Sequence, residues 1–301
     1  MTSVIRANYQ FDVYIVDMRP THVVEIVTPK KFLLNGLWFG PKKPKNAIIW
    51  IHGLGSSAFS KLDIAEKIAD TNTTVLTFNN RGHDTVTRVL QLSGKKKTKK
   101  ILAGAAHEVF TDCVDDIQGA IACAKKQGAK RIYLAGHSTG SQKSAYFAAK
   151  RSKDVDGIIL LAPMSDYAGA VHVDANAVTR GASAARKLVK AGKEHIIVPG
   201  WWMDAQRFLS LHTPDSVEEI FSYANPGKKP TTYQSVKVPL LVLLPEEDEY
   251  RDRPMDEIAA WFKLYQRSRS FAISIFPKAE HSFPGFESEV AQTIKQWISA
   301  L

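Results

Sequence analysis

Two kinds of hydrophobic pattern alternate along most of the chain. Short, almost wholly apolar runs are typical of strands buried on both faces of a parallel sheet. Such runs occur at residues 47–51, 74–78, 131–135, 157–162, 239–244 and 271–276. Apolar residues at helical spacing occur at 57–70, 109–127, 141–152, 255–269 and 286–300. Strands alternating with helices predict an α/β fold, with a mostly parallel, doubly wound sheet covered on both faces.

The first forty residues show a different pattern. Segments 11–17, 22–29 and 31–39 have partial apolar and polar alternation, and Asn35-Gly36 suits a turn. We therefore expect a short antiparallel ribbon of three strands before the parallel sheet begins.

Residues 163–238 interrupt the alternation. A structureless loop of this length is unusual in a compact domain, and the segment has helical spacing at 174–193, 204–211 and 216–223. Large apolar side chains gather at Trp201, Trp202, Met203 and Phe208. The pattern predicts a helical insertion between two strands of the sheet.

Gly136-His137-Ser138-Thr139-Gly140 carries the clearest chemical signal. It lies between a predicted strand, 131–135, and a predicted helix, 141–152. A strand, a tight turn around a serine and a helix form a nucleophile elbow. The residues beside the serine must be small because the turn is strained and the backbone passes close to its neighbours. Ser138 is the candidate nucleophile.

An incidental serine in a glycine-rich turn would not be followed by an acid and a histidine in a fixed order. Here Asp248 follows the apolar run 239–244, and His281 follows the run 271–276. The order serine, acid, histidine is that of a hydrolase triad on a parallel sheet. Asp166, just after the run 157–162, is the alternative acid, and we favour Asp248 because its strand directly precedes the histidine's strand.

From 46 to 301 the chain resembles the α/β-hydrolase superfamily, in particular its esterase and lipase-like members. The motifs that carry the resemblance are Ile51-His52-Gly53-Leu54-Gly55, the elbow around Ser138, Pro245-Glu246-Glu247-Asp248 and Ala279-Glu280-His281-Ser282-Phe283. The resemblance implies a core domain from residues 1–162 and 239–301, with 163–238 as a helical lid. Shorter segments, 79–84 and 112–117, are similar to a branch that includes siderophore-ester hydrolases.

The resemblance also implies roles for these residues. Ser138 attacks the substrate, His281 takes its proton, and Asp248 orients the histidine. The backbone N–H groups of Leu54 and Thr139 form the oxyanion hole. His83 and His137 are expected to be structural. No metal or organic cofactor is required by this chemistry.

The expected reaction is hydrolysis of a small-molecule carboxylic ester through an acyl-enzyme. Trp201, Trp202 and Met203 are expected to bind the substrate, and the alternative is that they form only the lid's own core. The same triad also serves amide, thioester and carbon–carbon bond hydrolases. Some proteins of this fold are ligand receptors without catalysis, and the sequence leaves these alternatives open.

Composition adds three limits. The 301 residues are 45% hydrophobic, as in ordinary globular proteins, and no apolar run reaches the ~18 residues of a membrane span. The first ten residues lack the apolar centre of a signal peptide. Cys113 and Cys123 are ten positions apart on one predicted helix, about 15 Å along its axis, which is too far for a disulfide. We expect reduced thiols in a cytoplasmic protein.

The net charge of +10 is concentrated locally. Five of the seven residues at 94–100 are lysines, and no aromatic residue lies among them. The run is therefore not a stacking platform for single-stranded nucleic acid, and no nucleic-acid partner is expected. The sequence favours a solvated loop here, with an acidic substrate or anionic partner as the alternative.

Overall fold

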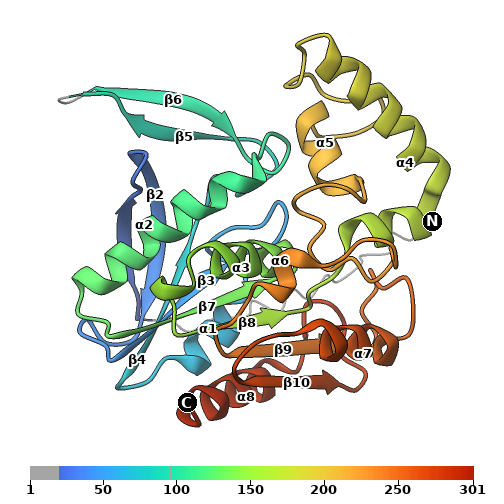
Figure 1. Ribbon diagram of the computed structural model, residues 1–301. Coiled ribbons are helices and arrows are strands. Elements are labelled where there is room, and N and C mark those ends of the chain that lie inside the picture. Colours follow the sequence, from blue (N-terminus) through green and yellow to red (C-terminus); the bar gives the residue numbers. More distant parts are fainter. Residues whose placement is uncertain (1–19, 95–96) are drawn as a thin grey trace, which may run out of the picture.

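A ten-stranded sheet forms the centre of the computed structural model, which describes residues 20–94 and 97–301 (Figure 1). Its strands are β1 (His22–Val27), β2 (Phe32–Phe39), β3 (Asn46–Ile51), β4 (Thr73–Phe78), β5 (Thr87–Leu92), β6 (Thr98–Ala103), β7 (Arg131–His137), β8 (Gly157–Leu161), β9 (Leu240–Pro245) and β10 (Phe271–Phe276). They lie in the order β10-β9-β8-β7-β3-β4-β2-β5-β6, and β1 pairs with β2. The strand expected at 11–17 lies outside the described residues.

The six strands from β10 to β4 along this order are parallel, whereas β1, β2, β5 and β6 pair antiparallel. The central strands are buried on both faces, which explains why they appear in the sequence as continuous apolar runs. The predicted α/β class and the antiparallel strands before the parallel sheet are confirmed.

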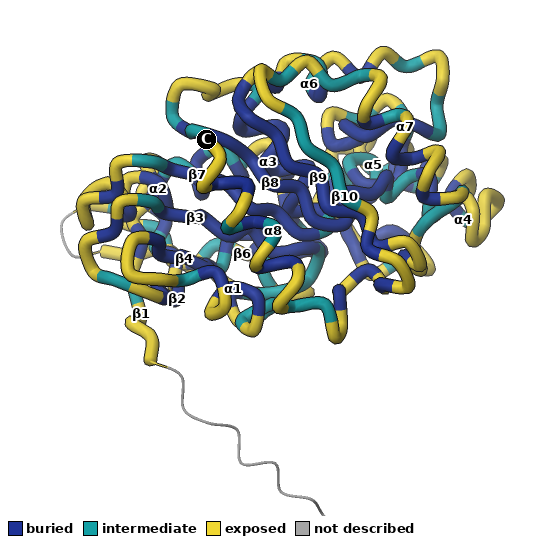
Figure 2. The backbone as a smooth tube through the Cα atoms, turned by 90° about the horizontal axis from the view of Figure 1, so that it is seen from below, coloured by how far each residue is buried: buried dark blue, intermediate teal, exposed yellow. Residues whose placement is uncertain are grey.

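Helices cover both faces of the sheet. On one face α1 (Leu62–Ile68) packs beside α8 (Glu287–Ser299), and their apolar side chains share a core with one face of the strands. On the other face lie α2 (Cys113–Lys126), α3 (Thr139–Lys150) and α7 (Met255–Tyr265). Short 3-10 helices at Phe110–Asp112 and Ser152–Asp154 precede α2 and follow α3. Figure 2 shows the buried strands between these two layers.

The segment 163–238 contains α4 (Asp166–Lys190), α5 (Ala205–His212) and α6 (Thr231–Gln234). Helices α4 and α5 stand at the upper right of Figure 1 and have a small apolar core of their own, whereas α6 packs on α3. The predicted start at residue 174 marks a kink: Asp174 leaves the helical conformation and its Oδ1 accepts from the N–H of Ala177 at 2.8 Å. Helix α4 nevertheless begins earlier, at Asp166.

Three predicted elements are wrong in part. Residues 216–223 form no helix, because Glu218 and Glu219 turn inward to bind Arg207 and Ser165. The helix expected at 57–70 is limited to Leu62–Ile68. The lysine-rich run is not simply a loop: the segments on its two sides pair as the hairpin β5–β6, and Lys99 and Lys100 lie within β6.

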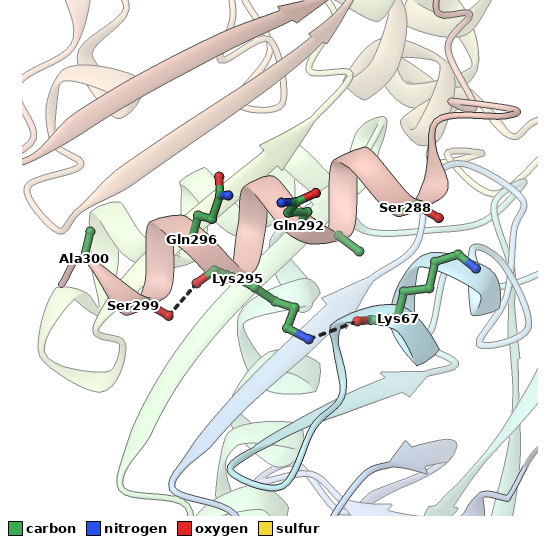
Figure 3. A pocket seen from close by; sticks show the side chains of 8 residues that line it. Lys67, Ser288, Gln292, Lys295, Gln296, Ser299 and Ala300 are labelled. Atoms are coloured by element: carbon green, nitrogen blue, oxygen red, sulfur yellow. Dashed lines mark hydrogen bonds between the residues drawn. The ribbon is translucent and has the colours of Figure 1, made fainter.

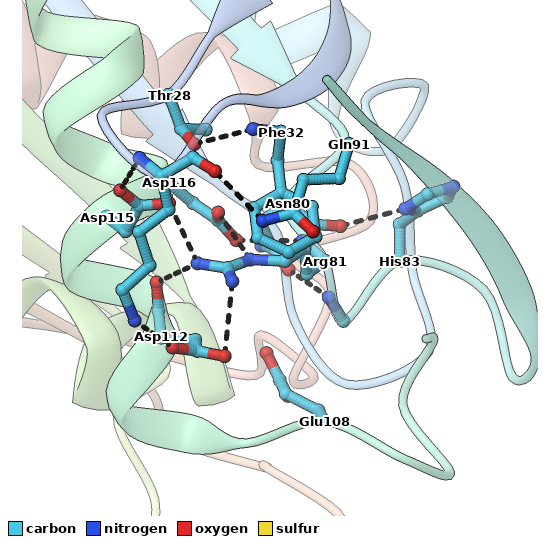
Figure 4. Close-up of polar contacts among 12 residues, drawn as sticks. Thr28, Phe32, Asn80, Arg81, His83, Gln91, Glu108, Asp112, Asp115 and Asp116 are labelled. Atoms are coloured by element: carbon cyan, nitrogen blue, oxygen red, sulfur yellow. Dashed lines mark hydrogen bonds and ion pairs between the residues drawn. The ribbon is translucent and has the colours of Figure 1, made fainter. Parts of the chain in front are cut away.

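The turn after β4 is fixed to α2 by a buried cluster of charges (Figure 4). The guanidinium of Arg81 pairs with Asp112 at 3.1 Å, Asp115 at 3.1 Å and Asp116 at 2.8 Å. Burial raises the pKa of Asp116 to about 6, against the attraction of Arg81. His83 lies two residues further on and binds the carbonyl of Asn80 at 2.8 Å. These residues hold the chain beside the carboxyl edge of the sheet.

No helix in the described part of the chain is long and apolar enough to cross a membrane. Cys113 and Cys123 are both free thiols. Burial raises the pKa of the Cys113 thiol well above its usual value, which leaves it protonated and unreactive.

Candidate active site

The elbow consists of a single residue between a strand and a helix. Strand β7 ends at His137 and α3 begins at Thr139, so Ser138 alone makes the turn, with φ 57° and ψ −127°. A positive φ is strained for a residue with a side chain and is retained where the surroundings impose it.

The two glycines of the motif are required by close backbone contacts. A Cβ on Gly140 would lie 2.1 Å from the carbonyl oxygen of Ile51, and a Cβ on Gly136 would lie 2.1 Å from the carbonyl oxygen of Gly140. Both distances are far shorter than any real contact. The sequence requirement for small residues therefore follows from the approach of α3 to β3 and β7.

Asp248 binds the ring of His281. The loop after β9 carries Asp248 and the loop after β10 carries His281, and His281 Nδ1 lies 2.7 Å from Asp248 Oδ2. The second oxygen of Asp248 accepts from the backbone N–H of Tyr250 at 2.9 Å. Both side chains are buried, with Asp248 1% and His281 6% exposed. An acceptor on Nδ1 fixes the tautomer that leaves Nε2 free to act as a base.

The backbone of His281 is also fixed on both sides. Its N–H donates to Glu249 Oε2 at 3.0 Å, and its carbonyl lies 2.9 Å from His137 Nε2. Burial lowers the pKa of His137 to about 3, so this ring is neutral and donates one N–H. Tyr250 packs edge-on against the His281 ring at 4.8 Å between centroids.

Ser138 and His281 line the same pocket, which has a volume of about 610 Å³. No hydrogen bond joins Ser138 Oγ to the His281 ring in the described residues. Such bonds are often long in unliganded hydrolases and tighten when substrate binds.

Asp166, the alternative acid, lies at the start of α4 and does not contact His281. Its Oδ2 accepts from Gln142 Nε2 at 2.7 Å. Burial, reinforced by the nearby carboxylate of Glu218, raises the pKa of Asp166 to about 8. The group lines the same pocket as Ser138 and is mostly protonated at neutral pH.

The loop after β3 lies directly against Ser138, the candidate nucleophile. A Cβ on Gly53 would stand 3.0 Å from Ser138 Cβ and 3.5 Å from Ser138 Oγ. The backbone N–H of Leu54, the next residue, has no acceptor in the described part of the chain. The N–H of Thr139 is at the first position of α3, where the helix itself offers no acceptor. Both N–H groups are therefore available to a ligand next to Ser138.

The three residues of the segment 163–238 that were expected to bind substrate all line the pocket but differ in burial. Met203 is 1% exposed and belongs to the apolar core between α4 and α5. Trp201 packs edge-on against Phe208 and against His212. Trp202 is 43% exposed and stands free of that core.

Other residues of the candidate site were not found from the sequence. Tyr250 packs on the His281 ring and lines the pocket, and His212 of α5 lines it as well. Gln142 donates to Asp166. Gln142 follows Ser138 by one helical turn, a spacing that could have drawn attention to it. The other two are brought in by contacts between distant segments.

A second concavity, of about 750 Å³, lies between α8 and α1 (Figure 3). It is lined by polar side chains such as Lys67, Gln292 and Lys295, and none of the predicted catalytic residues reaches it. The described residues contain no cluster of three or more His, Cys, Asp or Glu side chains that could hold a metal ion.

Comparison with models of protein families assigns the chain to one family. The family described as "Protein of unknown function (DUF1749)" matches residues 102–300, which include Ser138, Asp248 and His281. The chain belongs to this family. No curated protein matches this DUF1749 chain.

Solved structures similar to the DUF1749 chain include esterases and a siderophore hydrolase. A siderophore hydrolase, EstB from Aspergillus fumigatus, is 16% identical with a TM-score of 0.66, and the match covers 93% of this chain and 98% of that one. An esterase from Pyrococcus furiosus is 19% identical with a TM-score of 0.58, covering 93% and 91%. Est1E from Butyrivibrio proteoclasticus, solved with ferulic acid, is 17% identical with a TM-score of 0.57, covering 91% and 98%. The expected α/β-hydrolase fold is thereby confirmed.

Proposed function

We propose that this protein is a serine hydrolase that cleaves a carboxylic ester of a small molecule through an acyl-enzyme intermediate. The observation that carries the proposal is the 2.7 Å bond between His281 and Asp248, at the pocket that Ser138 also lines. Each of the three side chains comes from a different loop at the carboxyl edge of the sheet, where open α/β sheets bind ligands.

In the proposed first step, Ser138 Oγ attacks the ester carbonyl while His281 Nε2 takes the hydroxyl proton. Asp248 stabilises the resulting imidazolium and keeps the ring in place. The imidazolium then protonates the leaving alcohol, and the acyl group stays on Ser138. In the second step His281 takes a proton from the water that attacks the acyl-enzyme. The imidazolium then returns this proton to Ser138 Oγ as the acyl–oxygen bond breaks, which releases the carboxylic acid and regenerates the enzyme.

The negative oxygen formed in each step needs preorganised donors. The free N–H groups of Leu54 and Thr139 serve this role in the proposal. Gly53 supports it, because a glycine here lets the Leu54 loop approach Ser138 closely. The positive end of α3 adds a favourable dipole at the same point.

The segment 163–238 serves as a lid that selects substrates in this proposal. Its residues form one side of the pocket, and the core loops form the other. Trp202 has apolar area free to contact an acyl or alcohol group, whereas Met203 is already buried against α5.

The substrate belongs to the class of small esters with both apolar and polar parts. A pocket of about 610 Å³ fits a ligand of that size. Apolar groups of Trp202 and Val173 and polar groups of Asp166 and Arg251 line it together. A siderophore ester and a hydroxycinnamate ester are both candidates, because similar structures include a siderophore hydrolase and an esterase that binds ferulic acid.

Labelling with a fluorophosphonate, followed by a panel of activated esters, thioesters and amides, tests the proposal. The reagent should modify Ser138, and Ser138→Ala should lower turnover by about 10⁴ to 10⁶ while leaving the fold intact. Ser56→Ala is the matched control, because Ser56 lines the same pocket outside the triad. Tight ligand binding without labelling or turnover would favour a receptor instead.

A further inference from the structure

Strands β1, β2, β5 and β6 form an antiparallel wing at one edge of the sheet, and β6 is its outermost strand (Figure 1). Helix α2 covers one face of this wing, where Ile26, Phe32 and Val89 join the main core. The strand registers place the alternate side chains on the opposite face, which we call the outer face.

The outer face of the wing is apolar and exposed. Val27 lies opposite Leu33, Leu33 opposite Leu90, and Leu90 opposite Lys100, so one row of side chains crosses all four strands. Leu92 and Leu102 lie on the same face, on either side of this row. The exposed fractions are 45% for Val27, 37% for Leu90, 37% for Leu92 and 48% for Leu102.

Cations surround these leucines. Arg88 lies opposite Leu102 and Lys100 opposite Leu90, both on the outer face. The N–H of Leu92 donates to the carbonyl of Lys31 at 2.9 Å, so the turn that carries Lys31 lies beside the end of β5. The sequence between Thr85 and His107 contains no acidic residue, and Glu25 is the one acidic residue on the four strands.

We propose that the outer face of the wing docks on an anionic lipid surface. Exposed leucines enter the boundary between headgroups and acyl chains, while arginine and lysine side chains reach the phosphates. Each cation near a negatively charged leaflet adds to binding, and the apolar contact alone would be weak. The two contributions are combined here on one rigid face.

A second copy of the chain fits this face less well. Pairing of two β6 edges would bring Lys99 and Lys100 of both copies together, and lysines on an edge strand oppose such pairing. Protection of the edge explains the lysines but not the exposed leucines beside them. Nucleic acid fits less well too, because no aromatic residue of the four strands stands exposed on this face.

Co-sedimentation with vesicles tests the proposal. The protein should bind phosphatidylcholine vesicles that contain phosphatidylserine, and binding should fall at high salt. Binding to pure phosphatidylcholine should be at least about tenfold weaker. The double variant Arg88→Gln, Lys100→Gln should lower binding about thirtyfold, and Leu90→Ser, Leu102→Ser should lower it about tenfold or more.

The matched control is Lys187→Gln, Lys190→Gln with Val189→Ser, which removes two cations and one exposed apolar group from the end of α4. This control should bind as the unchanged protein does. Thermal unfolding midpoints establish that all variants fold. Four outcomes would each overturn the proposal. Two concern the vesicles: an equal loss of binding in the control variant, or no preference for anionic vesicles. The other two are a dimer held together by the wing and binding of RNA in preference to vesicles. The test does not involve Ser138, so its failure is distinct from failure of the hydrolase proposal.

Discussion

The two candidate acids, Asp248 and Asp166, differ in their surroundings and should differ in role. Asp248 binds the ring of His281, whereas Asp166 is bound by Gln142. We predict that Asp248→Asn lowers kcat about 10⁴-fold, because an amide at this position favours the wrong histidine tautomer. Asp166→Asn keeps a partner for Gln142 and should cost less than about tenfold.

The measurement is kcat for both variants on the same activated ester. A larger loss for Asp166→Asn than for Asp248→Asn would mean that Asp166, after the end of β8, is the residue that orients His281. Unfolding midpoints of both variants are the control, since Asp248 is 1% exposed and its replacement also tests packing.

Asp166 should also make stability depend on pH. Burial raises its pKa to about 8, so between the ordinary Asp pKa and pH 8 the folded protein holds a proton that the unfolded chain has lost. Stability must then fall as pH rises through this window, by up to about 1.4 kcal/mol per pH unit. Asp166→Asn removes this contribution.

We therefore expect Asp166→Asn to have a higher free energy of unfolding than the unchanged protein. The difference between the two proteins should be small near pH 4 and largest near pH 8. Denaturant unfolding at several pH values measures it. The difference between the two proteins isolates Asp166 from Asp116 and Glu219, whose pKa values burial raises to about 6 and about 7. A difference that does not change with pH would show that Asp166 is ionised in the folded state.

At the scale of elements, the elbow joins β7 to α3 with no free space. We predict that Gly140→Ala lowers the free energy of unfolding by about 3 kcal/mol or more, because its Cβ would overlap the carbonyl oxygen of Ile51. Activity should fall as well, since Ser138 moves with the helix. Gly227→Ala is the control: its nearest neighbour is 3.6 Å away, and its cost should be within about 0.5 kcal/mol. A Gly140→Ala protein as stable as the control would mean that α3 can shift freely.

The two adjacent tryptophans of the lid should give different results. Trp202 is 43% exposed at the pocket, so Trp202→Ala should change the ranking of short and long acyl esters by about ten- to two-hundredfold. Trp201 packs against Phe208 and His212, so Trp201→Ala should weaken the lid and lower activity on all esters alike. Values of kcat/KM over an ester series distinguish the two outcomes. Equal loss on every ester for Trp202→Ala would assign it a structural role only.

Much of the element order could be predicted because buried parallel strands leave continuous apolar runs. Strands 157–162 and 271–276 are examples, and both occur within one residue of the expected place. The hairpin β5–β6 was missed because both strands face solvent on one side and carry polar or charged residues, including Lys99 and Lys100 in β6, which removes the apolar signal. The helix expected at 216–223 does not form because two of its glutamates bind partners far away in sequence.

In the candidate site too, residues in local motifs could be predicted, whereas residues placed by contacts between distant segments could not. Ser138 and His281 could be placed from local motifs, since the elbow and the loop after a strand are both local in sequence. The pairing of Asp248 with His281 depends on two loops meeting, and chain order alone left Asp166 as an alternative. Tyr250 and His212 had no local signal, because their places at the pocket depend on the packing of the lid and of the acid loop.

Over the whole molecule, a buried cluster of charges joins the segment 163–238 to the core. Arg207 of α5 pairs with Glu218 and, at 3.2 Å, with Glu108 from the loop before α2. Glu108 also pairs with Lys143 of α3, which is fully buried close to the elbow. The attraction of Lys143 and Arg207 lowers the pKa of Glu108 despite its burial. The segment 163–238 is therefore anchored to α3, the helix that begins directly after Ser138.

This anchor leads to a prediction about the stability of the whole fold. Arg207→Met leaves Glu218 as an unpaired buried charge and should cost about 3–5 kcal/mol. Removing the partner as well, in Arg207→Met with Glu218→Leu, should restore at least about 2 kcal/mol, because Glu108 keeps Lys143. Denaturant unfolding measures both, and Arg186→Met, at an exposed position of α4, should stay within about 0.5 kcal/mol. Hydrogen exchange in α5 should quicken in the single variant and slow again in the double variant. A double variant as unstable as the single one would show that the packing of Arg207, rather than its charge, holds the lid on the core.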